Sequence, residues 1–453
     1  MPALAARVHA SELRWYRAEG VLRYEDAFFI CIKRRGEYMN FIEELKWRGL
    51  VKDCTDMEGL VKRLESPATI YCGFDPTADS LHVGHLQQIL LLRRWQKAGH
   101  TPIALCGGFT GMIGDPRPTT ERKLLSHEEV LHNAECIRTQ LAKFLDFEGD
   151  NAAIMENNNH WLGSLSLLDF LRDYGKLFNV AYMLQKDTIK KRLDSGLSYT
   201  EFTYTILQAI DFLNLHKLYH CDVQIGGSDQ WGNLTSGIEL IRKVLGDDEK
   251  VFGITSPLIT KSDGTKFGKS EGKNIWLDPA RTNAYEFYQF WLNTPDADIV
   301  DYLKRLSMRT PEEIEALAES LKSEPEKRAC QKALAQELTE IVHGKEGLAK
   351  AEKITETFFH GSIKDLSASE LREGLADAPK AHIEDGQLLV DALVSSGISK
   401  SKRDARTLIQ QGSIQVNGDK ITDTAYAMCR DCAYDGSFSI IRKGKKNYFV
   451  LEF

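Results

Sequence analysis

The stretch Thr69-Ile-Tyr-Cys-Gly-Phe74, followed by Asp75-Pro-Thr-Ala-Asp-Ser80, decides the fold class of this chain. The first six residues form an apolar run of strand length, and the next six favour a turn. A helix is predicted from about Gly84 to Ala98, because apolar residues recur there at helical spacing and Gly99 can end it. The segment is therefore expected to fold as a buried strand, a loop and a helix.

The same pattern recurs further along the chain. Pro102-Ile-Ala-Leu-Cys106 predicts the next strand, and Cys221-Asp-Val-Gln-Ile-Gly-Gly-Ser-Asp-Gln230 predicts a second strand–loop–helix unit. Strands that alternate with helices indicate the α/β class, with a doubly wound parallel sheet. In such a sheet the ligand lies at the carboxyl ends of the strands.

Beyond this region the pattern changes. Between about Ala280 and Ala376 it becomes helical, and Thr310-Pro-Glu-Glu313 supplies an N-cap residue, a proline at the first helical position and a glutamate at the third. Residues 377–386 are expected to be a linker, and a small mixed domain follows.

Composition places the chain among ordinary globular proteins. It has 453 residues, of which 42% are hydrophobic and 27% charged, and a formal net charge of −7. These values exclude a uniformly basic nucleic-acid coat protein. The tail from Leu388 to Phe453 carries 10 Lys/Arg against 7 Asp/Glu, which permits a local contact with nucleic acid.

Nine cysteines without a framework pattern favour a reduced, cytoplasmic compartment. Cys429 and Cys432 form a single C-x-x-C, for which two ordinary thiols are a better interpretation than a zinc site. No apolar run approaches the ~20 residues of a membrane span. Residues 1–38 lack the long apolar core of a secretory signal, so we expect neither a membrane anchor nor export.

His82-Val-Gly-His85 joins the predicted loop to its helix. A helix start offers free N–H groups and a positive dipole end, both suited to phosphate, and Gly84 permits close approach. Two imidazoles there can donate hydrogen bonds to phosphate charge that grows in a transition state. Taken alone, the motif is better explained by two surface histidines beside a helix cap. A metal pair is disfavoured further, because no third ligand lies nearby in the sequence.

Lys261-Ser-Asp-Gly-Thr-Lys-Phe-Gly-Lys-Ser270 is a Gly-rich loop in which Lys266 and Lys269 flank Phe267-Gly268. Such a loop can close over a polyphosphate, although it lacks the G-x-x-x-x-G-K-[ST] pattern of a Walker loop. A solvated surface turn is the alternative.

The predicted helix from about Glu201 to Leu218 carries Tyr204, Gln208 and Asp211 within one narrow wedge of its surface. Leu207 and Leu215 share this wedge. It can therefore form a pocket wall with converging hydrogen-bond groups, or simply a half-exposed face.

In combination these motifs are far more specific. H-x-G-H after a first strand, then G-G-S-D-Q, then K-F-G-K-S is an order that resembles class I aminoacyl-tRNA synthetases. Four longer blocks resemble the bacterial tyrosyl-tRNA synthetases: 71–85, 107–116, 201–204 and 224–233. The resemblance spans Met39 to Phe453.

This resemblance implies a division into parts. Residues 1–38 would be an extension of unknown role, and 39–279 a Rossmann-like catalytic domain with a dimerisation insertion. An α-helical domain on the anticodon side of the tRNA would cover 280–376, and the linker 377–386 would lead to a small α+β RNA-binding domain at 387–453.

The implied reaction has two steps. Tyrosine is activated by ATP, accompanied by Mg²⁺, to tyrosyl-adenylate with release of pyrophosphate, and is then transferred to the 3′ end of tRNA(Tyr). Attack of a carboxylate on the α-phosphate needs no covalent nucleophile, because positioning and electrostatics suffice. A homodimer is also implied.

The resemblance assigns roles to individual residues. The tyrosine site would comprise Tyr71 and Asp211 on the phenol, Asp115, Tyr204 and Gln208 on the ammonium group, and Gln230. The ATP site would comprise Cys72, Gly84, Arg122, Asp229 and Lys269, with His85 also near the ribose. The residues that handle the phosphates in catalysis would be Thr77, His82, His85, Lys266, Lys269 and Ser270.

Two positions depart from the family pattern. Arg117-Pro-Thr-Thr-Glu-Arg122 is shorter than its counterpart and lacks lysine. Arg122 matches the phosphate-binding arginine, and whether Arg117 replaces the lysine stays open. Gln88 stands where some relatives have a small hydroxyl residue near the ribose. Both departures bear on rate and ATP affinity rather than on reaction type.

The C-terminal residues resemble the S-four type RNA-binding domain found in a ribosomal protein. The matching segments are 388–393, 399–406 and 412–418. Lys400, Lys402, Arg403 and Arg406 form a basic edge suited to RNA phosphates. Alone, a charge run of this size is usually a solvated face, but after a synthetase core RNA binding is the better interpretation.

Other classes remain as alternatives. A nucleotidyltransferase that acts on a small molecule shares H-x-G-H and a lysine loop but needs no basic tail. A regulatory RNA-binding paralogue has little reason to keep both histidines and both lysines. Tryptophanyl-tRNA synthetases are the nearest competitor, and Tyr71 with Asp211 favours a phenol because an indole offers only one N–H donor.

Overall fold

The computed structural model describes residues 32–34, 37–116, 124–193, 196–262, 267–270, 273–444 and 447–453. The chain divides into two compact units: Met1–Asp278 with Thr294–Leu334, and Pro279–Asn293 with Ala335–Phe453. The helical stretch 280–376 contributes to both units. The domain limits expected from the sequence therefore stay a prediction.

A five-stranded parallel sheet forms the centre of the first unit, with strand order β5-β4-β3-β6-β7. Its strands are β3 (Thr69–Phe74), β4 (Thr101–Cys106), β5 (Ile154–Asn157), β6 (Cys221–Gly227) and β7 (Phe252–Ser256). The chain winds from β3 outward to β5 and then from β6 outward to β7. The predicted doubly wound α/β class is therefore confirmed, and the direction reverses between β3 and β6.

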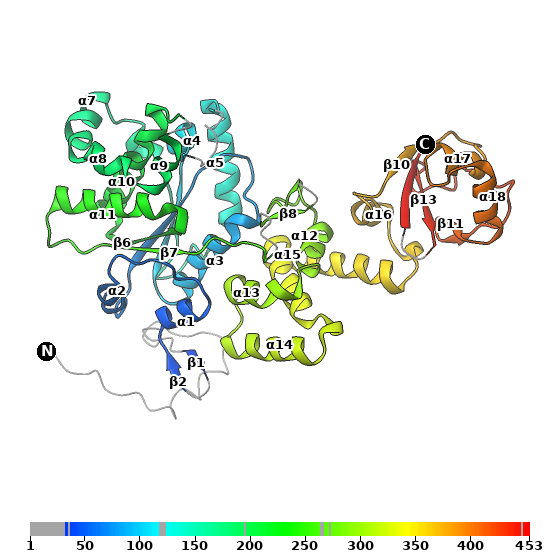
Figure 1. The fold of residues 1–453 in the computed structure, drawn as a ribbon, viewed down its shortest axis with the longest axis horizontal. Coiled ribbons are helices and arrows are strands. Elements are labelled where there is room, and N and C mark those ends of the chain that lie inside the picture. The colour runs from blue at the N-terminus through cyan, green and yellow to red at the C-terminus, as the bar shows by residue number, and fades with distance from the viewer. Residues whose placement is uncertain are drawn as a thin grey trace. The chain divides into compact units, whose positions relative to one another are not determined.

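Helices cover both faces of this sheet (Figure 1). One face carries α3 (Val83–Lys97) and α5 (His127–Leu141), and the other carries α10 (Tyr199–Tyr219) and α11 (Trp231–Leu245). Strand β3 and helix α10 meet in a buried apolar cluster in which the rings of Tyr71 and Phe212 lie 5.3 Å apart. The helix expected from about Gly84 to Ala98 is confirmed by α3, which spans Val83–Lys97.

Shorter elements complete the first unit. The strands are β1 (Ile32–Arg34), β2 (Glu37–Met39), β8 (Lys269–Ser270) and β9 (Lys273–Asn274). The helices are α1 (Phe41–Trp47), α2 (Met57–Arg63), α4 (Thr110–Ile113), α6 (Asn159–Leu162), α7 (Leu167–Asp169), the π-helix η3 (Phe170–Tyr174), η4 (Gly175–Leu177), α8 (Val180–Leu184), α9 (Asp187–Leu193), η5 (Ser228–Gln230), α13 (Asp296–Leu306), α14 (Pro311–Ser323) and η6 (Pro325–Lys327). Thr310 caps α14 with Glu313 in the predicted capping box.

A buried arginine ties α1 to the end of α13. Arg48 is 1% exposed and pairs with Glu44 at 2.6 Å. Its guanidinium donates to the carbonyl oxygens of Lys304 and Arg309, at 3.0 and 2.6 Å, and to that of Ser307. Arg94, in the last turn of α3, also donates to the carbonyl of Ser307. The helix that begins with the two histidines is therefore anchored at its far end.

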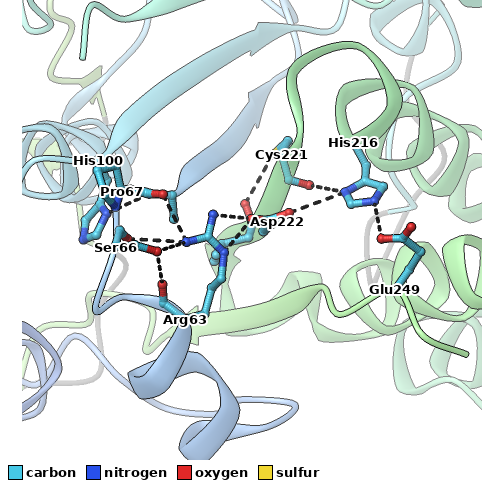
Figure 2. A network of polar contacts seen from close by, with 10 residues as sticks. Arg63, Ser66, Pro67, His100, His216, Cys221, Asp222 and Glu249 are labelled. Carbon is cyan, nitrogen blue, oxygen red and sulfur yellow. Dashed lines mark hydrogen bonds and ion pairs between the residues drawn. The ribbon is translucent and has the colours of Figure 1, made fainter. Parts of the chain in front are cut away.

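A second polar network lies at the amino ends of β3 and β6, away from the carboxyl ends (Figure 2). Arg63 pairs with Asp222 at 2.6 Å and also donates to the carbonyl oxygen of Pro67. His216 bridges from the Cys221 carbonyl, 3.0 Å from Nδ1, to Glu249, 3.3 Å from Nε2. This network joins α2, α10 and the start of β6.

The outer edge of β7 is covered by the segment 52–55. The Lys52 N–H donates to the Thr255 carbonyl at 2.7 Å, and the Thr255 N–H donates to the Asp53 carbonyl at 2.8 Å. The Thr55 N–H donates to the Gly253 carbonyl at 3.0 Å. The edge strand thus has partners for its backbone groups on both sides.

The second unit is built on a sheet of order β10-β14-β13-β11-β12. Its strands are β10 (Lys380–His382), β11 (Ile414–Val416), β12 (Asp419–Lys420), β13 (Phe438–Lys443) and β14 (Asn447–Glu452). Its helices are α12 (Ala284–Leu292), η7 (Ile363–Asp365), α16 (Ala368–Gly374), α17 (Leu389–Ser395) and α18 (Lys402–Gln410), and α15 (Ala329–His360) enters it from the first unit.

The stretch 377–386, expected to be a linker, contains a strand. Its residues Lys380–His382 form β10, which pairs in parallel with β14. Next to it, Ile354, Leu371 and Leu375 pack with Phe438, Ile440 and Val450 in one apolar cluster. Backbone pairing therefore gives order to a segment whose sequence shows no apolar periodicity.

Among the described residues, no helix is both long and apolar enough to cross a membrane.

Candidate active site

A cavity of about 280 Å³ opens between the carboxyl ends of β3 and β6, where the sheet reverses direction. It is lined by these residues singled out from the sequence: Tyr71, Cys72, Thr77, Gly84, His85, Gln88, Asp115, Tyr204, Gln208, Asp211, Asp229 and Gln230. The wedge of α10 that carries Tyr204, Gln208 and Asp211 is thus a cavity wall. Tyr204 and Asp211 are buried, so the alternative of a half-exposed face is wrong for these two residues, whereas Gln208 is partly exposed.

Asp211 is the most constrained carboxylate of the cavity. It is 2% exposed, and its two oxygens accept from Asn158 Nδ2 at 3.0 Å and from Trp161 Nε1 at 2.8 Å. Burial raises the pKa of Asp211 to about 7, although these two hydrogen bonds lower it. The carboxyl group can therefore change charge near neutral pH.

Two further polar groups are buried in the cavity wall without partners among the described residues. They are the Tyr71 hydroxyl and Gln208 Oε1. A buried polar group that makes no hydrogen bond costs about 1–3 kcal/mol, which a ligand with matching groups recovers. The cavity is therefore prepared for a polar ligand.

A chain of hydrogen bonds crosses the cavity from Asp211 to Tyr204. Asn158 Nδ2 also donates to Thr110 Oγ1 at 2.9 Å, and Thr110 Oγ1 donates to Asp75 Oδ1 at 2.8 Å. The Tyr204 hydroxyl donates to Asp75 Oδ2 at 2.8 Å. Asp75, Thr110, Asn158 and Trp161 are functional candidates to which the sequence analysis gave no role.

Asp115 lies in a second carboxylate cluster. Its oxygens accept from Gln230 Nε2 at 3.0 Å and from Asn233 Nδ2 at 3.3 Å. Burial raises the pKa of Asp115 to about 6, with a smaller contribution from Asp75. Together with Asp75 and Asp229 it gives this part of the cavity an acidic lining suited to a cationic group.

Helix α3 begins with both histidines in a capping box. His82 Nδ1 accepts from the Gly84 N–H at 3.0 Å, and His85 Nδ1 accepts from the His82 N–H at 3.2 Å. Because each Nδ1 is an acceptor, the proton of each neutral ring is on Nε2. The rings lie 4.0 Å apart, so two Nε2–H donors are presented by one helix start.

The expectation of free N–H groups at this helix start is wrong for its first three residues. The Val83 N–H donates to the Ile275 carbonyl at 3.0 Å and the His85 N–H to the His82 carbonyl at 2.8 Å, while that of Gly84 is taken by the His82 ring. A Cβ at Gly84 would lie 2.7 Å from that ring. Glycine is therefore required for the histidine cap.

The lysine loop is only partly within the described residues. Lys266, Arg117 and Arg122 lie outside them, and Lys269 and Ser270 are placed by their backbone alone, in β8. Phe267 is 7% exposed and packs edge-to-face on Tyr302, with ring centroids 5.2 Å apart.

The next residues hold this loop against the start of α3. Gly268 has φ +85°, and a Cβ there would lie 3.2 Å from Val83 Cγ2. The Ile275 N–H donates to the Gly268 carbonyl at 3.1 Å, and the Ile275 carbonyl accepts from Val83. The two motifs His82–His85 and Phe267–Ser270 are therefore adjacent.

The four basic residues predicted to meet RNA lie in the second unit. Lys400, Lys402, Arg403 and Arg406 are all exposed, at or just before helix α18. Lys402 Nζ pairs with Asp391 at 2.7 Å. Among the described residues, the structure gives no ion pair to Lys400, Arg403 or Arg406, so their charges are not neutralised in this way.

Within the described ranges, no group of three or more His, Cys, Asp or Glu side chains is arranged to hold a metal ion.

Similarity to known proteins agrees with this arrangement. Residues 62–360 match the family model of the class I tRNA synthetases (W and Y), and 370–451 match the tyrosine–tRNA ligase SYY-like C-terminal domain. The chain is 53% identical to the tyrosine–tRNA ligase of Desulfitobacterium hafniense (strain DSM 10664 / DCB-2), over 91% of this chain and all of that one. The chain belongs to the tyrosine–tRNA ligase family. The ligase of Geobacillus stearothermophilus is 52% identical, over 92% of this chain and 100% of the relative.

Solved structures of the family agree. A C-terminally truncated mitochondrial tyrosyl-tRNA synthetase from Aspergillus nidulans is 32% identical, with a TM-score of 0.63, and covers 70% of this chain and 94% of its own. The tyrosyl-tRNA synthetase of Archaeoglobus fulgidus shares the fold, with 18% identity, a TM-score of 0.53 and coverage of 68% of this chain and 100% of its own.

Proposed function

We propose that this protein joins tyrosine to tRNA(Tyr), with tyrosyl-adenylate as the intermediate. The observation that carries the proposal is the pair formed by Asp211 and Tyr71 in the cavity wall. Asp211 is a buried carboxylate aligned by two donors, and the buried Tyr71 hydroxyl has no partner among the described residues. The phenol hydroxyl of a bound tyrosine can donate to the Asp211 carboxylate and accept from the Tyr71 hydroxyl, and so it satisfies both groups.

Specificity follows from the cost of leaving these groups unpaired. Phenylalanine would leave the Tyr71 hydroxyl without a partner, at a cost of about 1–3 kcal/mol for that buried group. Asp211 would keep its bonds from Asn158 and Trp161 but would lose the donor that the substrate hydroxyl supplies. An indole N–H can donate to Asp211 but offers no acceptor for Tyr71. The pair therefore favours tyrosine over both other aromatic amino acids.

The amino group of tyrosine has matching partners. Asp115, Tyr204 and Gln208 are our candidates for its ligands, with Gln230 beside them and Asp75 supporting Tyr204. The carboxylates of Asp75 and Asp115 favour a bound ammonium ion electrostatically.

ATP would occupy the part of the cavity lined by Cys72, Gly84, His85 and Asp229. Thr77 and the Nε2–H groups of His82 and His85 are candidates to stabilise the phosphates. Lys266, Lys269, Ser270 and Arg122 are proposed to hold the departing pyrophosphate. Mg²⁺ would enter with the phosphates of ATP as part of that substrate.

The chemical step then requires positioning rather than a covalent nucleophile. A carboxylate oxygen of tyrosine attacks the α-phosphorus, and the bond from that phosphorus to the bridging oxygen of the β-phosphate breaks. Negative charge grows on the leaving pyrophosphate, where histidine Nε2–H and lysine ammonium groups stabilise it more in the transition state than in the ground state.

Pyrophosphate exchange into ATP tests this proposal. We expect exchange that depends on tyrosine and on neither phenylalanine nor tryptophan. Asp211→Ala should raise the KM for tyrosine by roughly 10- to 100-fold, since a hydrogen bond to a charged group contributes about 1.5–3 kcal/mol. Thermal unfolding of the variant controls for misfolding. Unchanged tyrosine-dependent exchange in a folded variant would exclude the pocket assignment.

We further propose that the second unit, with the helical stretch 280–376, binds tRNA(Tyr). Lys400, Lys402, Arg403 and Arg406 are the candidate phosphate contacts, supported by their exposure on one edge of α18. The match of 370–451 to the C-terminal domain of tyrosine–tRNA ligases supports the same assignment.

A homodimer in the cytoplasm completes the proposal. Large apolar side chains are exposed along the segment 167–199 of the first unit: Leu167, Leu168, Leu171, Val180, Tyr182, Leu193 and Tyr199. An exposed apolar surface of this kind favours association with another protein surface. The eight described cysteines are all free thiols, which supports a reducing compartment.

A further inference from the structure

The C-x-x-C sequence of the second unit folds into a tight turn. The Cys432 N–H donates to the Cys429 carbonyl at 3.2 Å, and the Ala433 N–H donates to that of Arg430 at 3.0 Å. Both thiols are free, Cys429 is partly exposed and Cys432 is exposed. Reagents in solution can therefore reach the pair.

The geometry of the turn suits a disulfide. The first and fourth Cα atoms of a β-turn lie within ~7 Å of each other. A disulfide needs about 4.4–6.8 Å between its Cα atoms. The pKa of the Cys432 thiol is raised mainly by its interaction with Cys429, so the two side chains lie near each other.

Neighbouring segments hold the turn in this shape. The Arg430 N–H donates to Asp385 Oδ1 at 2.8 Å, and the Met428 N–H donates to the Gln387 carbonyl at 2.8 Å. On the other side, Asn417 Nδ2 donates to the Cys432 carbonyl at 3.0 Å. These bonds fix the backbone on both sides of the pair while both thiols remain accessible.

We propose that Cys429 and Cys432 form a dithiol site that low-molecular-weight disulfides oxidise reversibly to an intramolecular disulfide. One thiolate attacks a sulfur of the small disulfide, which forms a mixed disulfide and releases one small thiolate. The second cysteine then attacks the protein sulfur of that mixed disulfide and releases the second small thiolate. The two protons lost by the cysteines convert the released thiolates to thiols, so the small disulfide is reduced by two electrons and the cysteine pair is oxidised by two.

The surroundings of this pair argue against a catalytic dithiol, because they reduce the fraction of Cys432 that is thiolate. The interaction with the Cys429 thiol and the carboxylates of Asp431 and Asp385 raise the pKa of the Cys432 thiol. Catalytic C-x-x-C cysteines instead have a lowered pKa. A metal site is also disfavoured, because no third His, Cys, Asp or Glu ligand joins the pair among the described residues.

The test uses the full-length protein incubated with oxidised glutathione, followed by alkylation of free thiols and mass spectrometry of peptides. We expect an intramolecular disulfide confined to the peptide that contains Cys429 and Cys432, reversed by dithiothreitol. Cys429→Ser and Cys432→Ser should each stop at the mixed glutathione disulfide. Cys136→Ser, which changes another partly exposed thiol, should leave the disulfide unaffected.

Three results would overturn the proposal. The first is a wild-type protein in which both thiols remain free under conditions that modify Cys136. The second is a mixed disulfide that persists in the wild type, because the two sulfurs would then fail to meet. The third is stoichiometric protection of the pair by Zn²⁺ added alone, which would indicate a metal site instead.

Discussion

At the scale of single residues, the chemistry of the cavity depends on how Asp211 is held. Asn158 and Trp161 fix the direction of its oxygens and also lower the cost of its charge. Asn158 in addition contacts Thr110, which contacts Asp75, so one amide links the phenol-binding and ammonium-binding ends of the proposed tyrosine site. A substitution of Asn158 should therefore alter the protonation of Asp211 as well as the shape of the cavity.

The pKa of Asp211, about 7, predicts a pH dependence. The carboxylate form accepts the phenol proton, so kcat/KM for tyrosine in pyrophosphate exchange should fall as pH decreases through about 7. Asn158→Ala removes a hydrogen bond that lowers this pKa. The midpoint should then move upward, with a loss of roughly tenfold at pH 7, about the effect of one hydrogen bond, and partial recovery at pH 8.5.

Asn214→Ala is the matched control. Asn214 lies on α10, the helix of Asp211, and among the described residues its amide donates to the Ile210 carbonyl alone. Its pH profile should equal that of the wild type. A loss in Asn158→Ala that is the same at every pH would mean that Asn158 shapes the pocket without affecting the charge of Asp211.

His82 combines a structural and a chemical role that can be separated. Its Nδ1 caps α3, and Nε2–H is the donor proposed for phosphate. Asn is also a good N-cap residue but cannot place a donor at the position of Nε2. His82→Asn should therefore keep the thermal stability of the wild type and lower the rate of adenylate formation by about 100-fold or more, as loss of a transition-state donor does.

Pre-steady-state formation of tyrosyl-adenylate measures this rate. Thr310→Ala removes the cap of α14 and is the control for cap loss, with lower stability and an unchanged rate. A change in the KM for ATP alone, with the rate of adenylate formation intact, would contradict this prediction. It would mean that the histidine binds ATP equally in the ground state and the transition state.

At the scale of elements, helix α18 carries the predicted RNA contacts. Its side chains are not equivalent, because Lys402 is paired with Asp391 whereas the structure gives no ion pair to Arg403 or Arg406 among the described residues. The two arginines should therefore contribute more to the binding of tRNA than the lysine does.

Arg403→Ala with Arg406→Ala should weaken the binding of tRNA(Tyr) and reduce the slope of log K against log salt by about 1.5, since each phosphate contact contributes ~0.7–0.9. Filter binding at several salt concentrations measures the slope, and tyrosine-dependent pyrophosphate exchange should be unchanged. Arg138→Ala with Lys143→Ala removes two exposed charges from the first unit as a control. Equal slopes in both double variants would exclude α18 as the contact.

At the scale of the whole molecule, the proposed chemistry is divided between the two units. The cavity is lined entirely by residues of the first unit, and the basic edge belongs to the second. Activation of tyrosine should thus be separable from recognition of tRNA.

The proposed dimer predicts the effect of charges in the exposed apolar segment. Leu168→Asp with Val180→Asp should shift the protein toward a monomer in sedimentation velocity, because a buried unpaired carboxylate strongly opposes association. Leu131→Asp is the control, because Leu131 is also exposed but lies on α5, outside the segment 167–199. This variant should leave the assembly state unchanged. A wild-type protein that sediments as a monomer would contradict the proposal.

Much of the fold was predictable because strong local signals coincide with its central elements. The run 69–74, the helix after it and the strand near 102–106 have apolar patterns, and most of their apolar residues are buried in the structure. Strand β5 was missed because it has only four residues, all half-buried, and β10 because its three residues, Lys380–His382, show no apolar pattern.

The candidate site divides in the same way. Tyr71, which lies in a long family block, and Asp211, which was assigned by matching the family pattern between two such blocks, could be predicted by resemblance. Asn158 and Trp161 follow the missed strand β5, so no local pattern placed them at the carboxyl edge of the sheet. They could have been found from the rule that ligands bind at the carboxyl ends of parallel strands. That rule would have had to be applied to the polar run Asn157-Asn158-Asn159. The histidine cap was also missed, because an imidazole as N-cap acceptor is outside the usual preferences for that position.

The covering of β7 by the segment 52–55 affects how the protein behaves when it is heated. A parallel sheet with a bare edge strand offers a row of N–H and C=O groups to which another chain can add. In the native state Lys52, Asp53 and Thr55 occupy those groups. If this segment detaches before the sheet melts, the released edge becomes a template for intermolecular pairing, and aggregation would begin there while most of the molecule is still folded.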